Sequence, residues 1–128
     1  MAGERILIVD DNATNLKLVA YLMRANGYVV DTALDAESAI LSIRVNHPDV
    51  ILMDIQLPGI DGLELTRRLK ADPKTRDIVI VAVTAYAMKG DQAKALAAGC
   101  DDYITKPIDT RTLPETIAKH LAKREGLS

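Results

Sequence analysis

Residues 78–84 read Ile78-Val79-Ile80-Val81-Ala82-Val83-Thr84, six apolar residues followed by a hydroxyl side chain. The run lacks the in–out alternation of a strand that has one face in water. Continuous β-branched runs of this length are typical of strands that are covered on both faces in a parallel sheet. Similar apolar runs predict four further strands, near residues 5–10, 28–33, 49–54 and 101–105.

The segments between these runs have helical periodicity. Apolar residues recur at helical spacing in four of them, beginning at Leu16, Ala36, Leu65 and Leu113. An alanine-rich segment near residues 88–98 predicts a further helix, which Gly99 ends. The last helix begins either at a capping box formed by Thr112 and Glu115 or one turn earlier, at Asp109 or Thr110. Five strands alternating with five helices predict an α/β fold with a doubly wound, five-stranded parallel sheet.

The composition narrows the class of protein. A chain of 128 residues and 13.9 kDa fits one domain, and its core must be aliphatic because it contains no Phe and no Trp. The net charge of −2 comes from interspersed acidic and basic residues, which argues against direct nucleic-acid binding. No apolar run approaches the roughly 18 residues of a membrane span, so a cytoplasmic location is expected. Cys100 is the single cysteine and is expected to be a small buried thiol.

Polar side chains follow the predicted strands at their carboxyl ends. Asp10 and Asp11 follow the first strand, Asp54 the third, Thr84 the fourth and Lys106 the fifth. Parallel strands end at the same edge of a sheet, which is where ligands bind in such folds. Carboxylates gathered there would repel one another, and Mg²⁺ prefers oxygen ligands of this kind. An aspartate can act as a nucleophile toward phosphorus, with lysine and threonine stabilising the phosphoryl oxygens. The set predicts covalent phosphorylation of an aspartate.

Four motifs carry a resemblance to a known family: Ile8-Val9-Asp10-Asp11-Asn12, Leu52-Met53-Asp54-Ile55-Gln56-Leu57-Pro58-Gly59-Ile60-Asp61-Gly62, Val83-Thr84-Ala85 and Tyr103-Ile104-Thr105-Lys106-Pro107. In order and spacing they resemble the receiver domains of two-component response regulators, especially stand-alone receivers of bacterial phosphorelays. The resemblance covers residues 4–124. It implies a flavodoxin-like sheet with strand order 2-1-3-4-5 and a signalling switch that turns over no independent substrate.

The resemblance also implies roles for individual residues. Asp54 would be the phosphoacceptor. Mg²⁺, with Mn²⁺ as an alternative ion, would bind Asp10, Asp11, Asp54 and the backbone carbonyl of Gln56. Lys106 would contact the phosphoryl group, and the peptide bond before Pro107 would be cis. The remaining implied roles are a switch pair, Thr84 and Tyr103, and two positions that tune dephosphorylation, Gln56 and Tyr86.

The implied partners are a histidine kinase or histidine phosphotransfer protein as donor, and a downstream protein target that the sequence does not identify. The donor would dock on the first helix, at or near Asn15, Leu16, Leu18, Val19 and Leu22. The output face would comprise residues 87–123, and a monomer or weak dimer is expected. An aromatic residue at position 86 can shield an acyl phosphate, so we expect phospho-Asp54 to last minutes or longer. His47 and His120 are expected to be surface residues, and neither shows a companion in the sequence that would make it a phosphodonor or metal ligand.

Several alternatives remain. The chain could be a receiver domain cut from a hybrid histidine kinase or a larger regulator. A phosphohydrolase of the haloacid dehalogenase type also uses strand-end Asp, Thr and Lys, but there the nucleophile follows the first strand. A flavodoxin-like cofactor binder would need a phosphate loop after the first strand, where this chain has Asp10-Asp11-Asn12. A degenerate receiver that cannot be phosphorylated is disfavoured because the whole core set is present.

Overall fold

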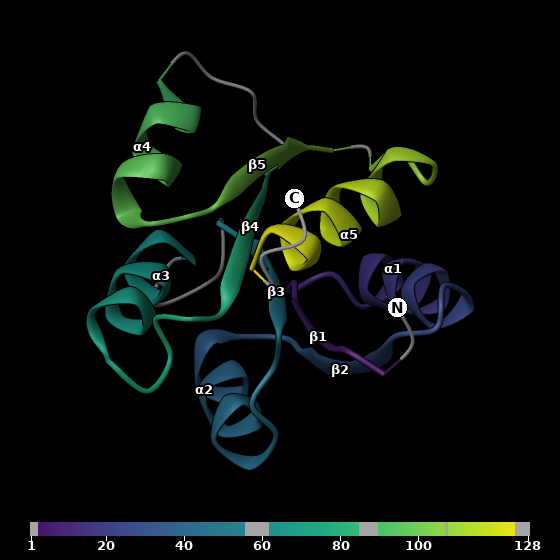
Figure 1. The fold of residues 1–128 in the computed structure, drawn as a ribbon, viewed down its shortest axis with the longest axis horizontal. Coiled ribbons are helices and arrows are strands. Elements are labelled where there is room, and N and C mark those ends of the chain that lie inside the picture. Colours follow the sequence, from purple (N-terminus) through teal and green to yellow (C-terminus); the bar gives the residue numbers. More distant parts are fainter. Residues whose placement is uncertain (1–2, 56–61, 85–89, 107, 125–128) are drawn as a thin grey trace.

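The computed structural model describes residues 3–55, 62–84, 90–106 and 108–124. Strands and helices alternate strictly along the chain (Figure 1). The strands are β1 (Arg5–Val9), β2 (Val29–Ala33), β3 (Val50–Asp54), β4 (Val79–Thr84) and β5 (Asp102–Thr105). The helices are α1 (Ala13–Ala25), α2 (Ala36–Val45), α3 (Gly62–Ala71), α4 (Asp91–Ala98) and α5 (Thr112–Arg124).

The strands form one parallel sheet of order β2-β1-β3-β4-β5. Helices α1 and α5 cover one face, and α2, α3 and α4 cover the other (Figure 1). The predicted fold class and the strand order implied by the family resemblance are both confirmed. Every residue of β3 and of β4 is buried, as the continuous apolar runs predicted. The strand order reverses between β1 and β3, so the carboxyl ends of these two strands flank the crevice where such sheets bind ligands.

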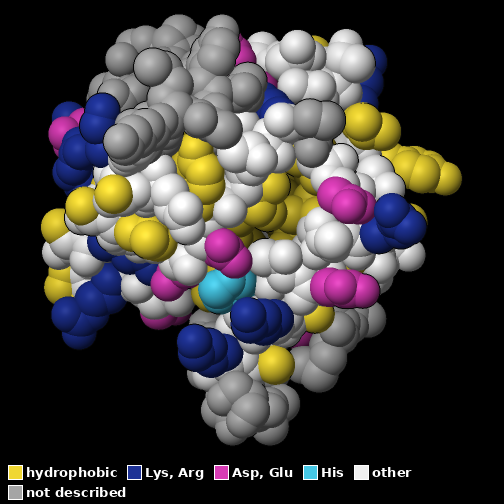
Figure 2. Space-filling view, turned by 90° about the horizontal axis from the view of Figure 1, so that it is seen from above, with side chains coloured by type: hydrophobic (Ala, Val, Ile, Leu, Met, Phe, Trp, Pro, Cys, Tyr) yellow, Lys and Arg dark blue, Asp and Glu magenta, His cyan; other side chains and the backbone are white. Residues whose placement is uncertain are grey.

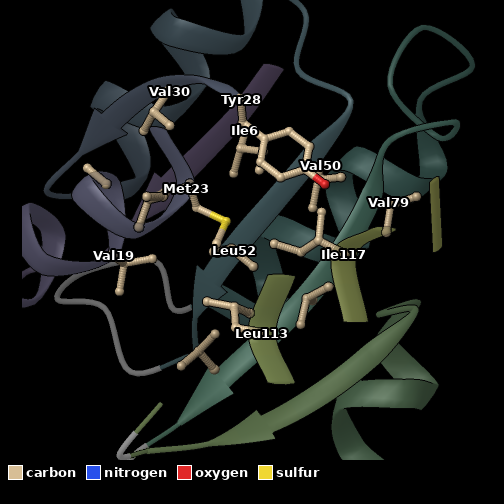
Figure 3. Packing of buried hydrophobic residues seen from close by; sticks show 14 of the residues in the cluster. Ile6, Val19, Met23, Tyr28, Val30, Val50, Leu52, Val79, Leu113 and Ile117 are labelled. Atoms are coloured by element: carbon tan, nitrogen blue, oxygen red, sulfur yellow. The ribbon is translucent and has the colours of Figure 1, made fainter. Parts of the chain in front are cut away.

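The surface mixes charged side chains of both signs, as the interspersed sequence predicted (Figure 2). The core is aliphatic on both sides of the sheet. On the α1–α5 side, Tyr28 is the aromatic member, and its ring packs among Ile6, Val50 and Ile117 (Figure 3). Burial, and then the negative charge of Glu4, raise the pKa of the Tyr28 hydroxyl.

The ends of two helices, α4 and α5, can be compared with those predicted from the sequence. Helix α4 begins at Asp91, later than residue 88, and ends as expected at Gly99, which has φ of 108°. A side chain at position 99 would meet the Lys70 side chain at 2.8 Å, so both the backbone angle and the available space favour glycine there. Helix α5 begins at Thr112, closer to the capping-box start than to the start one turn earlier, and Asp109 forms the turn that leads into it. The Asp109 carboxylate accepts the N–H of Arg111, and the Asp109 carbonyl accepts the N–H of Leu113.

Candidate functional site

The predicted site residues lie at the carboxyl ends of four strands. Asp10 directly follows β1, and its N–H donates to the carbonyl of Ala33 at the end of β2 (3.1 Å). Asp54 is the last residue of β3, and Thr84 is the last residue of β4. Lys106 follows β5, and its N–H donates to the carbonyl of Thr84 (2.7 Å). Backbone hydrogen bonds between neighbouring strands therefore fix where these side chains start.

Three carboxylates gather at this edge. Asp10, Asp11 and Asp54 each offer an oxygen, and these oxygens lie within 4.8 Å of one another. Asp10 and Asp54 are buried, with exposed fractions of 7% and 4%, whereas Asp11 is exposed. Oxygen-only donors, two of them withdrawn from water, fit a hard divalent cation and not a soft one that prefers sulfur or imidazole.

Lys106 provides the positive charge of the site. Its Nζ atom lies 3.0 Å from Oδ2 of Asp10 and 3.5 Å from Oδ2 of Asp54. Burial alone would lower the pKa of the Lys106 ammonium, but the hydrogen bond to Asp10 and the charges of Asp54 and Asp10 outweigh it and raise that pKa. The lysine is therefore held in its charged form beside the carboxylates.

Helix α1 helps to orient Asp10. The Oδ1 atom of Asp10 accepts the backbone N–H of Asn12 (2.9 Å), which leaves Oδ2 for Lys106. Asn12 in turn caps α1, because its side-chain oxygen accepts the N–H of Asn15 (3.1 Å). The capping role of Asn12 was not among the predictions, although an Asn before a helical pattern is its ordinary sequence signal.

Helix α3 approaches the Asp54 backbone very closely. A Cβ atom added at Gly62 would lie 2.4 Å from the Asp54 carbonyl oxygen and 2.7 Å from Cα of Ile55. Only glycine fits this contact without a shift of backbone. Gly62 was quoted above as part of the Asp54 motif, but nothing in the sequence predicted the contact.

Thr84 and Tyr103 differ in their surroundings. Thr84 is fully buried and pairs in register with Thr105, whereas Tyr103 is half-buried and packs against the core on the α2–α3–α4 side. The Tyr103 N–H donates to the side chain of Asp102 (2.8 Å). The structure thus brings Asp10, Asp11, Asp54 and Lys106 into one cluster with Thr84 on the strand beside β3. Gln56, Tyr86 and Pro107 lie outside the described residues.

His120 is less exposed than the expected surface position. Its ring is half-buried between α5 and β5, and Nε2 lies 2.8 Å from Oδ2 of Asp102. The pair is 18 residues apart in the chain, so no local pattern marks it. His47 is exposed as expected, and its Nε2 lies 3.4 Å from Oδ1 of the exposed Asp77. Cys100 is buried as predicted, and burial raises the pKa of its thiol.

A groove of about 420 Å³ borders the cluster on the α1 side. Its lining is mostly apolar and joins α1 to the segment after β5: Asn15, Leu18, Val19, Leu22, Lys106, Ile108 and Thr110. Leu18 lines this groove and is 59% exposed, so it adds accessible apolar surface beside the polar cluster. Four of the five predicted docking residues on the first helix line this groove: Asn15, Leu18, Val19 and Leu22.

Comparisons with known proteins agree with this arrangement. The family model described as response regulator receiver domain matches residues 6–118. The polar-differentiation response regulator DivK of Brucella ovis is 46% identical over 116 residues, which cover 91% of this chain and 94% of the relative. Among the described residues, no helix is long and apolar enough to cross a membrane.

Solved structures give the same result. A CheY-like receiver domain protein from Methanospirillum hungatei has a TM-score of 0.90 and 31% identity, covering 99% of this chain and all of its own. The receiver domain of a sensor histidine kinase from Pseudomonas aeruginosa has a TM-score of 0.83 and 36% identity, covering 92% of this chain and 97% of its own. That structure holds a magnesium ion in its active-site cleft. From the fold, the acidic cluster and these matches together, the chain belongs to the response regulator receiver family.

Proposed function

We propose that residues 4–124 form a phosphoacceptor switch that takes a phosphoryl group from a phosphohistidine onto Asp54. The observation that supports this most is the placement of Lys106, within 3.5 Å of carboxylates of both Asp10 and Asp54 at the strand ends. Such an arrangement supplies a nucleophile, an acidic metal site and a fixed positive charge in one crevice. The switch would act in the cytoplasm and would turn over no independent substrate.

In the proposed step, an Oδ atom of Asp54 attacks the phosphorus of the phosphohistidine. The N–P bond breaks, its electron pair returns to the imidazole, and the imidazole takes up a proton from water. An acyl phosphate remains on Asp54. Lys106 would then pair with a phosphoryl oxygen, while the Thr84 hydroxyl would donate to another.

The carboxylates of Asp10, Asp11 and Asp54, with the backbone carbonyl of Gln56, would hold Mg²⁺. The ion supplies neutralisation of the charge on the transferring phosphoryl oxygens. Mn²⁺ would substitute, because it accepts the same oxygen ligands.

The α1 groove fits the proposed donor partner. It opens beside Lys106, and Leu18 and Leu22 line it with apolar surface that a histidine kinase or phosphotransfer protein would cover. Output would pass through Thr84 and Tyr103 to the face formed by α4, β5 and α5, within residues 87–123. Figure 2 views the molecule from this side and shows apolar side chains on it together with acidic and basic ones. Gln56 and Tyr86 would tune hydrolysis, giving phospho-Asp54 a lifetime of minutes or longer.

Intact-protein mass spectrometry after incubation with acetyl phosphate and Mg²⁺ tests the proposal. We expect a gain of about 80 Da, one phosphoryl group, that is absent in Asp54→Asn. Asp77→Asn removes an exposed carboxylate far from the cluster and should still be phosphorylated. An unmodified wild-type protein, or an adduct that persists in Asp54→Asn, would refute the assignment. A phosphoryl lifetime of seconds that Tyr86→Ala leaves unchanged would refute the shielding role.

A further inference from the structure

A second groove lies between α2 and α3, on the face of the sheet opposite α1. It measures about 710 Å³ and is lined by side chains of both helices and of the segment that follows α3. The phosphorylation site and the α1 groove use none of these residues. The groove therefore needs its own explanation.

The floor of this groove is apolar. It is formed by Ile40 and Ile43 from α2 and by Leu65 and Leu69 from α3. Three of these side chains are buried and belong to the core beneath, while Ile40 is half-buried. Two further large apolar side chains of α2, Leu41 and Val45, lie outside the groove lining and are 61% and 77% exposed.

The rim of the groove is basic, although the chain as a whole is acidic. Arg44, Arg68 and Lys74 line it, together with His47 and with one carboxylate, Asp72. Asp72 is already engaged, because its Oδ1 atom accepts the backbone N–H of Lys74 (2.9 Å).

Two of the rim cations have no side-chain partner among the described residues. Arg68 is paired with Glu64 at 3.7 Å. Arg44 and Lys74, by contrast, form no ion pair with any residue that the structure describes. Positive charge is thus available at both sides of an apolar floor.

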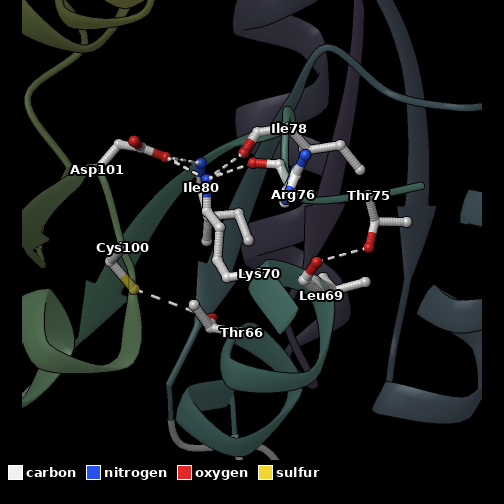
Figure 4. A network of polar contacts seen from close by, with 9 residues as sticks. All are labelled: Thr66, Leu69, Lys70, Thr75, Arg76, Ile78, Ile80, Cys100 and Asp101. Carbon is white, nitrogen blue, oxygen red and sulfur yellow. Dashed lines mark hydrogen bonds and ion pairs between the residues drawn. The ribbon is translucent and has the colours of Figure 1, made fainter. Parts of the chain in front are cut away.

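The end wall of the groove is held in place before any partner arrives. Thr75 donates its hydroxyl to the carbonyl of Leu69 (2.6 Å), which fixes the segment after α3 against that helix (Figure 4). Lys70 reaches from α3 to the carbonyls of Arg76 (3.3 Å) and Ile78 (2.7 Å) and to the carboxylate of Asp101 (3.0 Å). A preformed wall lowers the ordering cost of binding.

We propose that this α2–α3 groove binds an acidic amphipathic segment of a partner protein. The apolar face of such a segment would cover the groove floor, including Ile40. Its carboxylates would pair with Arg44 and Lys74. A small anionic ligand would leave Leu41 and Val45 uncovered, whereas a helix laid along α2 reaches them. Because α1 lies on the other face of the sheet, a phosphodonor and this partner could be bound at the same time. The groove would then make the receiver a two-sided adaptor.

The experiment uses the full chain, labelled with ¹⁵N, and a capped peptide about 16 residues long, enough for a helix. The peptide carries leucine at i, i+3, i+4 and i+7 spacing and glutamate elsewhere; a matched peptide carries lysine in place of glutamate. We expect saturable binding of the glutamate peptide, with amide shifts centred on Ile40, Ile43 and Leu69. Arg44→Glu and Lys74→Glu should each weaken binding by about fivefold, while Lys119→Glu on α5 should leave it unchanged.

The inference is overturned if the lysine peptide binds equally well, or if the shifts map to the α1 groove. It is also overturned if no saturation is reached by about 1 mM peptide, or if Arg44→Glu has no effect. Analytical sedimentation tests the remaining alternative, that a second copy of this chain occupies the groove. A dimer that Arg44→Glu dissociates would show that the groove is a self-interface and would refute binding of a separate partner. Arg44 and Lys74 are exposed, so these substitutions leave the core intact. Phosphorylation of Asp54 is not required for any of these readouts.

Discussion

A methyl group at Gly62 would lie 2.4 Å from the carbonyl oxygen of Asp54. Real Cβ atoms essentially never come closer than 3.0 Å to another heavy atom of this kind. Gly62→Ala must therefore push α3 and the end of β3 apart by at least 0.6 Å, the difference between those two distances. The atoms that the methyl group would meet, the Asp54 carbonyl oxygen and Cα of Ile55, both belong to the backbone, so no side-chain rotation can relieve the overlap. The proposed nucleophile sits on the strand end that has to move.

Two effects on stability oppose each other in this variant. Alanine gains up to about 1 kcal/mol over glycine inside a helix, and less in the first turn, where Gly62 stands. Overpacking against fixed backbone costs about 1–3 kcal/mol. The steric term is the larger, so we expect the free energy of unfolding to fall by about 1–2 kcal/mol. Displacing a reacting group by about 1 Å can cost 100-fold in rate, so phosphorylation of Asp54 should slow by about tenfold or more.

Urea unfolding and the rate of phosphorylation by acetyl phosphate measure the two quantities separately. Gly99→Ala is the matched control, because it strains a left-handed residue beside Lys70 and touches nothing at the site. It should lower stability and leave the phosphorylation rate unchanged, whereas Gly62→Ala should lower both. A Gly62→Ala protein with the stability and rate of the wild type would show that the close approach of α3 does not constrain Asp54.

Three further predictions follow from the same geometry. The pKa values of Tyr28, Cys100 and Lys106 are all raised by folding, so their contribution to stability is complete below the unfolded pKa of the thiol, near pH 9. It is lost as the pH rises through the folded values, and urea midpoints that stay level up to pH 11 would contradict this. Adding Mg²⁺ at ten times its Kd should raise the free energy of unfolding by about 1.4 kcal/mol; calorimetry that finds the same gain in Asp54→Asn would exclude that carboxylate as a ligand. His120→Ala should cost about 1 kcal/mol or less through its hydrogen bond to Asp102, because that carboxylate is 40% exposed; urea unfolding that finds no loss would show that the pair is merely adjacent.

The parts of this fold that sequence predicts well are those in which one local pattern has one structural outcome. The run from Ile78 to Val83 is apolar without interruption, and every residue from Val79 to Thr84 is buried in the sheet. Asp10, Asp54 and Lys106 were predictable as neighbours because parallel strands end at one edge. The start of α4 was less accurate, since alanines give helix propensity without a stripe that marks where packing begins.

The parts that sequence did not predict depend on contacts between distant segments. His120 meets Asp102 only because α5 packs across β5, and its own neighbours in the chain carry no sign of that pairing. The α2–α3 groove depends in the same way on how Ile40 and Leu69 face each other across two helices. Hydrophobic periodicity predicts that each helix has a buried side, but not where two helices leave a space between them.

The site is also late to be completed during synthesis. Asp10 and its partner Lys106 are 96 residues apart, and Lys106 follows the last strand to be made. At about 5–20 residues per second, a growing chain carries its three carboxylates for seconds before their positive counterpart emerges from the ribosome. Until then the acidic edge has no lysine to offset its self-repulsion, and β4 has no β5 beside it. A chain that ends before Lys106 would therefore hold the three carboxylates without the positive charge that the proposed phosphoryl transfer uses.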